Sequence, residues 1–261
     1  MRSRYLAASL LFLASCSGGT GDPPSVKVLG PPVGDGKRIR EVANPDIKDR
    51  PGPGSEVTVT GVTVVAVDNF DETGDGKSRG TIYIQDANSK APFSGISLYA
   101  PSFVPADLRV APGDVLDFTG PYAEVDHIGA AVFAPNVLVQ LNRPIGTYRF
   151  DGPPPEPVDI DVNDLLDYNV GRKWVGMLVR AKNVSVQDAP FPSKGRLTAC
   201  IGGDCGNNKS NPPQISNELY DLQMSEVAGL PTFESVTGIV TFFFSLKIAP
   251  RSSADLVLAK K

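Results

Sequence analysis

The sequence predicts an all-β protein with two small Greek-key barrels in tandem, behind a disordered N-terminal tether. β-Branched residues alternate with other residue types along 56–67, a pattern that suits a pleated strand. A proline-rich linker at 151–157 separates two halves of the chain. One pattern, a strand, a glycine, a second strand, an Ala-Pro turn and an apolar strand, occurs at 118–139 and again at 236–258. This repeat indicates duplicated units.

The N-terminus has the features of a secretion signal. Two arginines precede an apolar run at 5–13 that is too short to cross a bilayer as a helix. The run ends in Leu-Ala-Ser-Cys at 13–16, which resembles the bacterial lipobox. The resemblance implies that the signal peptide 1–15 is removed and that Cys16 carries the acyl chains, palmitate among them, that anchor the protein in the bacterial cell envelope, at the outer membrane. The alternative is an ordinary secretory signal with an incidental cysteine.

Residues 16–54 are rich in Gly, Pro and small polar residues and poor in large apolar ones. Such a composition buries too little surface to offset chain entropy, so the segment is predicted to be a lipidated tether. Within it, 37–42 is a candidate short helix or edge segment packed on the first barrel.

The two remaining cysteines, Cys200 and Cys205, are predicted to form a disulfide. An even number of cysteines in an exported protein favours this pairing. Zinc is the rival ligand, but His127 is the only histidine of the chain, and two thiolates do not complete a tetrahedral site.

The strands are predicted from alternation and turn residues. In the first half, 55–150, strands fall at 56–67, 81–85, 96–99, 115–119 and 137–139, with 106–110 as a candidate helix. Gly61 interrupts the first strand where a barrel needs a bulge or a coil. In the second half, 158–261, a helix-like segment at 160–166 precedes a long strand at 174–186.

These hydrophobic and turn positions resemble the OB-fold modules that accompany bacterial secreted nucleases and occur in surface lipoproteins. The matching segments are 61–63, 83–86, 95–99, 112–115 and 119–120 in the first half, and 176–179, 183–184, 249–251 and 254–256 in the second. The resemblance implies two OB-like barrels, at 55–150 and 158–261, and no catalytic domain. The chain is then expected to be a binding module on a lipid anchor.

Outward-facing aromatic residues are the first candidates for ligand binding. Tyr83 and Tyr99 alternate with inward-facing apolar residues on neighbouring strands, and Phe70 and Tyr122 extend the set. We expect these four side chains to contact a protein or glycan ligand. Three consecutive phenylalanines at 242–244 cannot all point into one barrel, so they are expected to meet the other barrel or a partner protein.

Four carboxylates crowd the loop that follows the first strand. Asp68, Asp71, Glu72 and Asp75 lie within eight residues, with glycines that permit tight turns. Clustered carboxylate oxygens are ligands that Ca²⁺ prefers, so the loop is a candidate calcium site, although its spacing is not that of an EF-hand. The alternative is an exposed, solvated loop.

Catalysis and nucleic-acid binding are both disfavoured. Asp126 cannot orient the adjacent His127 on a strand, and the sequence has no nucleophile elbow or phosphate-binding loop. Between 55 and 150 there are six basic and eleven acidic residues, so the field of this half repels a polyanion. The sequence therefore predicts a non-catalytic, envelope-anchored lipoprotein that acts as a binding or adaptor module. The alternative is a nucleic-acid-binding accessory of a secreted nuclease system.

Overall fold

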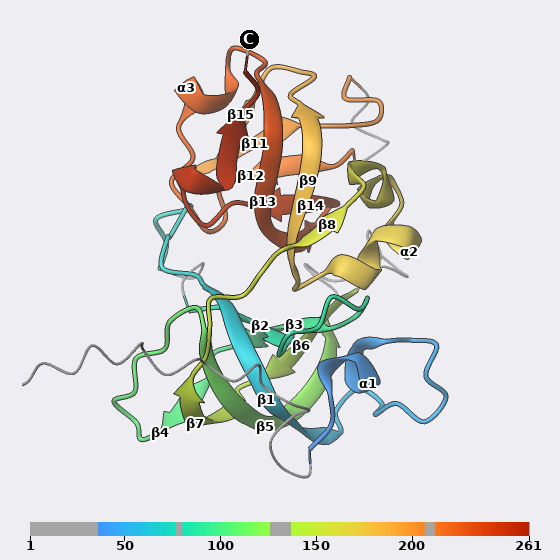
Figure 1. Ribbon diagram of the computed structural model, residues 1–261, viewed down its shortest axis with the longest axis vertical. Coiled ribbons are helices and arrows are strands. Elements are labelled where there is room, and N and C mark those ends of the chain that lie inside the picture. The colour runs from blue at the N-terminus through green and yellow to red at the C-terminus, as the bar shows by residue number, and fades with distance from the viewer. Residues whose placement is uncertain (1–35, 77–79, 126–136, 207–211, 261) are drawn as a thin grey trace, which may run out of the picture.

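The structure is a computed structural model that describes residues 36–76, 80–125, 137–206 and 212–260. Strands make up 44% and helices 12% of it, which confirms the predicted all-β class. Figure 1 shows two bodies stacked along the long axis, each built around its own sheet. None of the helices among the described residues is long and apolar enough to cross a membrane.

The first sheet contains a closed five-stranded barrel. Its seven strands are β1 (Glu56–Val67), β2 (Ile82–Asp86), β3 (Gly95–Tyr99), β4 (Ser102–Val104), β5 (Asp114–Val125), β6 (Leu138–Asn142) and β7 (Ile145–Asp151). They follow the order β1-β2-β3-β6-β5-β7-β4, and β1 also pairs with β5, which closes the barrel. At Gly61, with φ of 62°, the β1–β5 register shifts between Val59 and Val62, as the sequence predicts.

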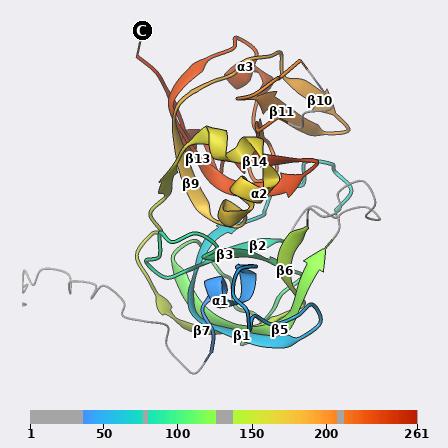
Figure 2. The same cartoon turned by 90° about the vertical axis from the view of Figure 1, so that its right-hand side faces the viewer.

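A short helix, α1 (Ile39–Ala43), lies across one open end of this barrel (Figure 2). Ile39 and Val42 are completely buried in the barrel core. The carboxylate of Asp86 accepts hydrogen bonds from the backbone N–H of Ile39 (2.7 Å) and of Arg40 (3.3 Å). The predicted short helix at 37–42 packed on the first barrel is therefore confirmed as α1. The prediction of a tether is wrong for 36–54, because α1 completes the core and the later residues Arg50 and Gly54 donate hydrogen bonds to Tyr122.

The second sheet has eight strands. They are β8 (Val158–Ile160), β9 (Leu178–Ser185), β10 (Phe191–Ser193), β11 (Arg196–Cys200), β12 (Gln214–Ser216), β13 (Thr232–Phe243), β14 (Ser245–Ala249) and β15 (Leu256–Leu258). The order is β10-β11-β12-β14-β13-β9-β8, with β15 beside β13. No strand pairing among the described residues closes this sheet, so a second closed barrel is not confirmed.

Short helical segments flank the second sheet. They are η1 (Val162–Leu166), α2 (Tyr168–Gly171), η2 (Arg172–Trp174), α3 (Met224–Val227) and η3 (Ser253–Asp255). The predicted helix at 160–166 corresponds to η1.

Two other predictions about helices and strands need correction. Trp174 precedes β9 rather than opening it, because its indole N–H donates to Asp164 in η1 (2.9 Å). The candidate helix at 106–110 is only a turn, in which the backbone N–H of Leu108 donates to the carbonyl of Pro105.

The predicted disulfide between Cys200 and Cys205 is present, with the two Cα atoms 5.8 Å apart. Cys200 ends β11, and Cys205 lies in the loop that follows. The bond therefore closes a small loop at the end of this strand, as expected from the cysteine arithmetic. Cys16 and His127 lie outside the described residues.

The barrel and the second sheet pack directly against each other. A separate apolar cluster joins β1 to the second sheet; its buried members are Val65, Ala66, Leu178, Leu219, Ile239 and Ala249. The backbone N–H of Leu178 donates to the Oε1 of Gln85 (3.1 Å), and that of Phe93 donates to the carbonyl of Lys173 (2.7 Å). β1 is thus buried on both faces, one by the barrel core and one by the second sheet.

Candidate functional site

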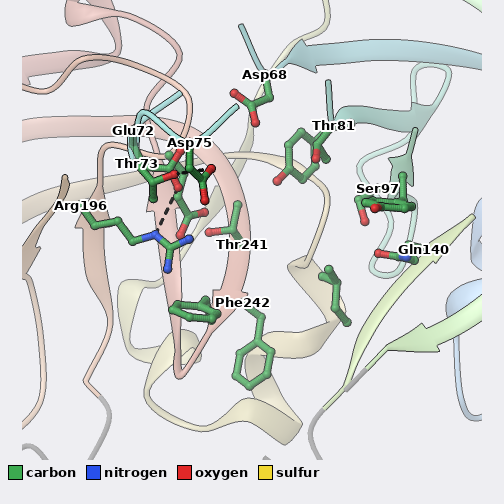
Figure 3. A pocket seen from close by; sticks show the side chains of 15 residues that line it. Asp68, Glu72, Thr73, Asp75, Thr81, Ser97, Gln140, Arg196, Thr241 and Phe242 are labelled. Carbon is green, nitrogen blue, oxygen red and sulfur yellow. Dashed lines mark hydrogen bonds and ion pairs between the residues drawn. The ribbon is translucent and has the colours of Figure 1, made fainter. Parts of the chain in front are cut away.

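A pocket of about 380 Å³ lies at the junction between the barrel and the second sheet (Figure 3). From the first sheet and its β1–β2 connection it is lined by Asp68, Glu72, Thr73, Asp75, Thr81, Tyr83, Ser97, Tyr99, Leu138 and Gln140. From the second half it is lined by Arg196, Glu218, Thr241, Phe242 and Phe243. Neither half forms this pocket alone.

The structure brings two of the four predicted aromatic residues to the pocket. Tyr83 lies on β2, with the buried Ile82 and Ile84 facing the barrel core, and Tyr99 at the end of β3 is 54% exposed. Phe70 is partly exposed in the neighbouring loop and does not line the pocket. The two tyrosines form one aromatic wall.

The assignment of Tyr122 to a surface platform is wrong. Its side chain is completely buried in the barrel core. The phenol donates to Glu124 (2.9 Å) and accepts a hydrogen bond from Arg50 (2.8 Å), and burial raises the pKa of Tyr122. The alternation of β5 points this residue inward, and the buried hydroxyl obtains its partners at the rim of the barrel.

The acidic loop is docked on the second sheet rather than solvated. Its start is held by backbone hydrogen bonds from Asp68 N–H to the carbonyl of Thr81 (2.8 Å) and from Gly80 N–H to the carbonyl of Asp68 (3.0 Å). The side chains of Asp68 and Glu72 are both buried. Glu72 reaches across to β11, where its Oε1 accepts a hydrogen bond from Arg196 Nε (3.2 Å).

The four carboxylates of this loop do not converge as a calcium site. Asp71 turns into its own loop and accepts from the N–H groups of Gly74 (3.0 Å) and Gly76 (2.6 Å), whereas Glu72 pairs with Arg196. In the described ranges, no group of three or more His, Cys, Asp or Glu side chains is arranged to hold a metal ion. The glycines permit a tight turn, and that turn satisfies Asp71 with backbone donors instead of leaving it for a cation.

Acidic side chains gather in the pocket, and the pKa values of two of its residues are raised. Burial, together with the charges of Glu72, Glu218 and Asp71, raises the pKa of Asp68 to about 7. Burial and the same acidic surroundings raise the pKa of Tyr83 well above its usual range. Arg196 is the only cationic residue among the described residues of the lining, and its guanidinium also lies 4.6 Å from the ring centroid of Phe243.

Two buried polar atoms of the lining have no hydrogen-bond partner. They are the Oε2 of Glu72 and the Oγ1 of Thr241, on side chains that are 8% and 5% exposed. The described residues contain only two other such atoms, in Thr60 and Ser216, and neither residue lines this pocket. An unpaired buried acceptor costs about 1–3 kcal/mol. A ligand that donates to these atoms would remove this cost.

Asp68→Asn is expected to reduce the fall in stability that the wild-type protein shows as the pH rises. The folded pKa of Asp68 is raised from its ordinary value of 3.8 to about 7, so the folded state holds a proton that the unfolded state has released. The stabilisation is complete below pH 4 and is lost as the pH rises through 7. At pH 8 we expect the variant to be more stable than wild type by about 1–2 kcal/mol.

Urea unfolding at pH 5, 6, 7 and 8 measures this difference. A smaller slope of the same sign should remain in the variant, because burial raises the pKa of Asp86 to about 6. Glu234→Gln, which changes an exposed carboxylate on β13, is the matched control and should leave the pH profile as in wild type. A wild-type protein whose stability rises between pH 5 and 8 would contradict the assignment.

Sequence reasoning missed the wall contributed by the second half. Arg196, Glu218 and Thr241 belong to no motif, and they become neighbours of the acidic loop only because the second sheet packs on the barrel. The phenylalanine run at 242–244 was the one available signal. Phe242 and Phe243 line the pocket at the junction, as the expected contact with the first half requires.

No protein-family model matches the sequence, and a search of curated proteins finds no significant match. The chemistry of the pocket is therefore the basis for a functional assignment. Its described lining residues contribute carboxylates, hydroxyls, an amide, aromatic rings and one guanidinium, but no cysteine or histidine.

Proposed function

We propose that this chain is a non-catalytic binding lipoprotein of the bacterial cell envelope and that it holds a glycan in the junction pocket. The observation that carries the proposal is the composition of the walls. Aromatic rings of Tyr83, Tyr99 and Phe242 line the same pocket as the polar side chains of Ser97 and Gln140. A pocket of about 380 Å³ is within the size range of small-molecule sites.

Sugars match such walls because each ring has an apolar face and a rim of hydroxyl groups. Aromatic rings bury the apolar face, and side-chain hydroxyls, amides and carboxylates bond to the rim. Ser97 is held in place by donating to the carbonyl of Val139 (3.3 Å), and Gln140 by donating to Asn142. A concave site of this kind suits a glycan unit better than a flat protein surface.

The proposal includes the anchor and the ancestry of the two halves. Lipidation at Cys16 would place the pocket outside the cytoplasm, at the end of the segment that precedes α1. The closed five-stranded barrel and the repeat in the sequence support descent from tandem OB-like modules, similar to those that accompany secreted nucleases. In this proposal the chain lacks the nuclease domain that such modules accompany, and the pocket between its two modules binds the glycan.

The alternative, a nucleic-acid accessory, is less well supported. The pocket lining contains four carboxylates and one guanidinium, so its field repels phosphates. The aromatic wall could stack bases, but among the described lining residues no basic groove follows a nucleic-acid backbone beside it.

Tyr99→Ala is expected to weaken glycan binding about tenfold, because an aromatic contact is worth about 1.5 kcal/mol. Immobilised glycans covering neutral, acidic and amine-bearing sugars should be probed with the full mature chain, and the hits quantified by calorimetry. Phe191→Ala is the matched control, since this ring is 68% exposed and lies outside the pocket. Failure to bind any glycan at millimolar concentration, or equal loss in both variants, would overturn the proposal.

A further inference from the structure

The charge of the pocket indicates what its ligand must carry. Asp68, Glu72, Asp75 and Glu218 supply four carboxylates, and Arg196 supplies the only cation among the described residues of the lining. Lys247 adds a partial neutralisation from behind, with its Nζ 3.8 Å from Glu218. Without counting Asp75, the three acidic side chains Asp68, Glu72 and Glu218 still outnumber Arg196 and this lysine, so these residues favour a cationic ligand group.

The two buried atoms without a hydrogen-bond partner indicate which groups the ligand carries. The Oε1 of Glu72 accepts a hydrogen bond from Arg196, and its buried Oε2 has no hydrogen-bond donor. The hydroxyl oxygen of Thr241 is also without a partner, and Figure 3 shows it directed to the side of the pocket where the acidic loop lies. Both atoms accept hydrogen bonds. A protonated primary amine has three donors and a positive charge, so it matches acceptors of this kind.

A metal ion does not meet these requirements. In the part of the chain that the structure describes, no group of three or more His, Cys, Asp or Glu side chains is arranged to hold one. The aromatic side chains of Tyr83, Tyr99 and Phe242 instead favour an organic cation, because a ring face attracts an ammonium group placed over it.

We propose that the glycan bound in this pocket contains an unacetylated amino sugar, whose ammonium group bonds to Glu72 and Thr241. This inference rests on the proposed function. The hydroxyls of the sugar then face Ser97 and Gln140 on the barrel wall. A lysine side chain carries the same charge but no hydroxyls, so it leaves that wall without donors or acceptors to match.

The test measures by calorimetry the affinities of three β-1,4-linked tetrasaccharides. They are the tetramers of glucosamine, of N-acetylglucosamine and of glucose. The free amine is expected to bind at least about tenfold more tightly than the other two, because hydrogen bonds to charged groups are the stronger ones. Glu72→Gln should remove this preference, so that the three tetramers bind with affinities within about twofold of one another. Glu234→Gln, an equal change of charge at an exposed site, should retain the preference.

Thr241→Val provides a second variant that removes one acceptor and keeps side-chain volume, so the test does not depend on whether Glu72→Gln folds. It should lower affinity for the glucosamine tetramer more than affinity for the other two tetramers. Equal affinity for the free and the acetylated sugar would overturn the inference and leave glycan binding intact, whereas no binding of any sugar would overturn the proposed function. Equal or tighter binding of a lysine-rich peptide would show that the amine comes from a protein and would likewise overturn the amino-sugar assignment.

Discussion

Gly176→Val is expected to lower the free energy of unfolding by about 3 kcal/mol and to loosen the junction between the barrel and the second sheet. Gly176 has φ of 79°, and a Cβ there would lie 2.7 Å from the backbone nitrogen of Ile96. The facing residue is Gly95, whose own Cβ would lie 2.5 Å from the carbonyl carbon of Gly176. Two backbones meet at this point, and neither can move aside as a flexible side chain would.

Two costs combine in this variant. A left-handed conformation costs a β-branched residue about 1–2 kcal/mol, and overpacking costs about 1–3 kcal/mol. Gly54→Val separates them, because Gly54 has φ of 88° and no described atom within 4 Å of the position that a Cβ would take. This control should therefore be destabilised only by the cost of the left-handed conformation. Calorimetry of the three proteins measures the difference.

The junction variant should also lose glycan binding, since the pocket needs both halves. We further expect its unfolding to split or broaden, because the barrel core and the second core are coupled through this contact. If the two valine substitutions lower the free energy of unfolding equally, the close contact of Gly95 and Gly176 does not add to the cost at Gly176.

Cys16→Ser is expected to abolish membrane attachment. The proposed lipobox requires the thiol as the acylation site. The variant should accumulate as an unprocessed precursor or appear in the soluble fraction, without incorporation of labelled palmitate. Fractionation with metabolic labelling of cells that express the full chain measures both effects.

Cys200→Ser is the matched control for the loss of a thiol. This residue belongs to the disulfide with Cys205, so its replacement should reduce stability and leave palmitate labelling unchanged. Palmitate that persists in Cys16→Ser would exclude this cysteine as the lipid-bearing residue and would remove the envelope anchor from the proposed function.

Local sequence patterns determined much of the first half. Alternation placed Ile82 and Ile84 in the core and Tyr83 outside it, and Gly61 marked the shift of register in β1. In the second half, the even number of cysteines that remain after Cys16 predicted the disulfide between Cys200 and Cys205. These features depend on residue type and on period two along a strand, both of which are visible in the sequence.

Packing decided the features that involve distant segments. Tyr122 belongs to the barrel core, α1 joins that core through Ile39, and the acidic loop pairs with Arg196 more than a hundred residues away. The pocket results from the same packing, because β1 presents a second apolar face that the later strands cover. A periodic pattern states which residues share a face. Which surface covers that face depends on the free energy of burying the face and that surface together. Only the tertiary structure shows which surface this is.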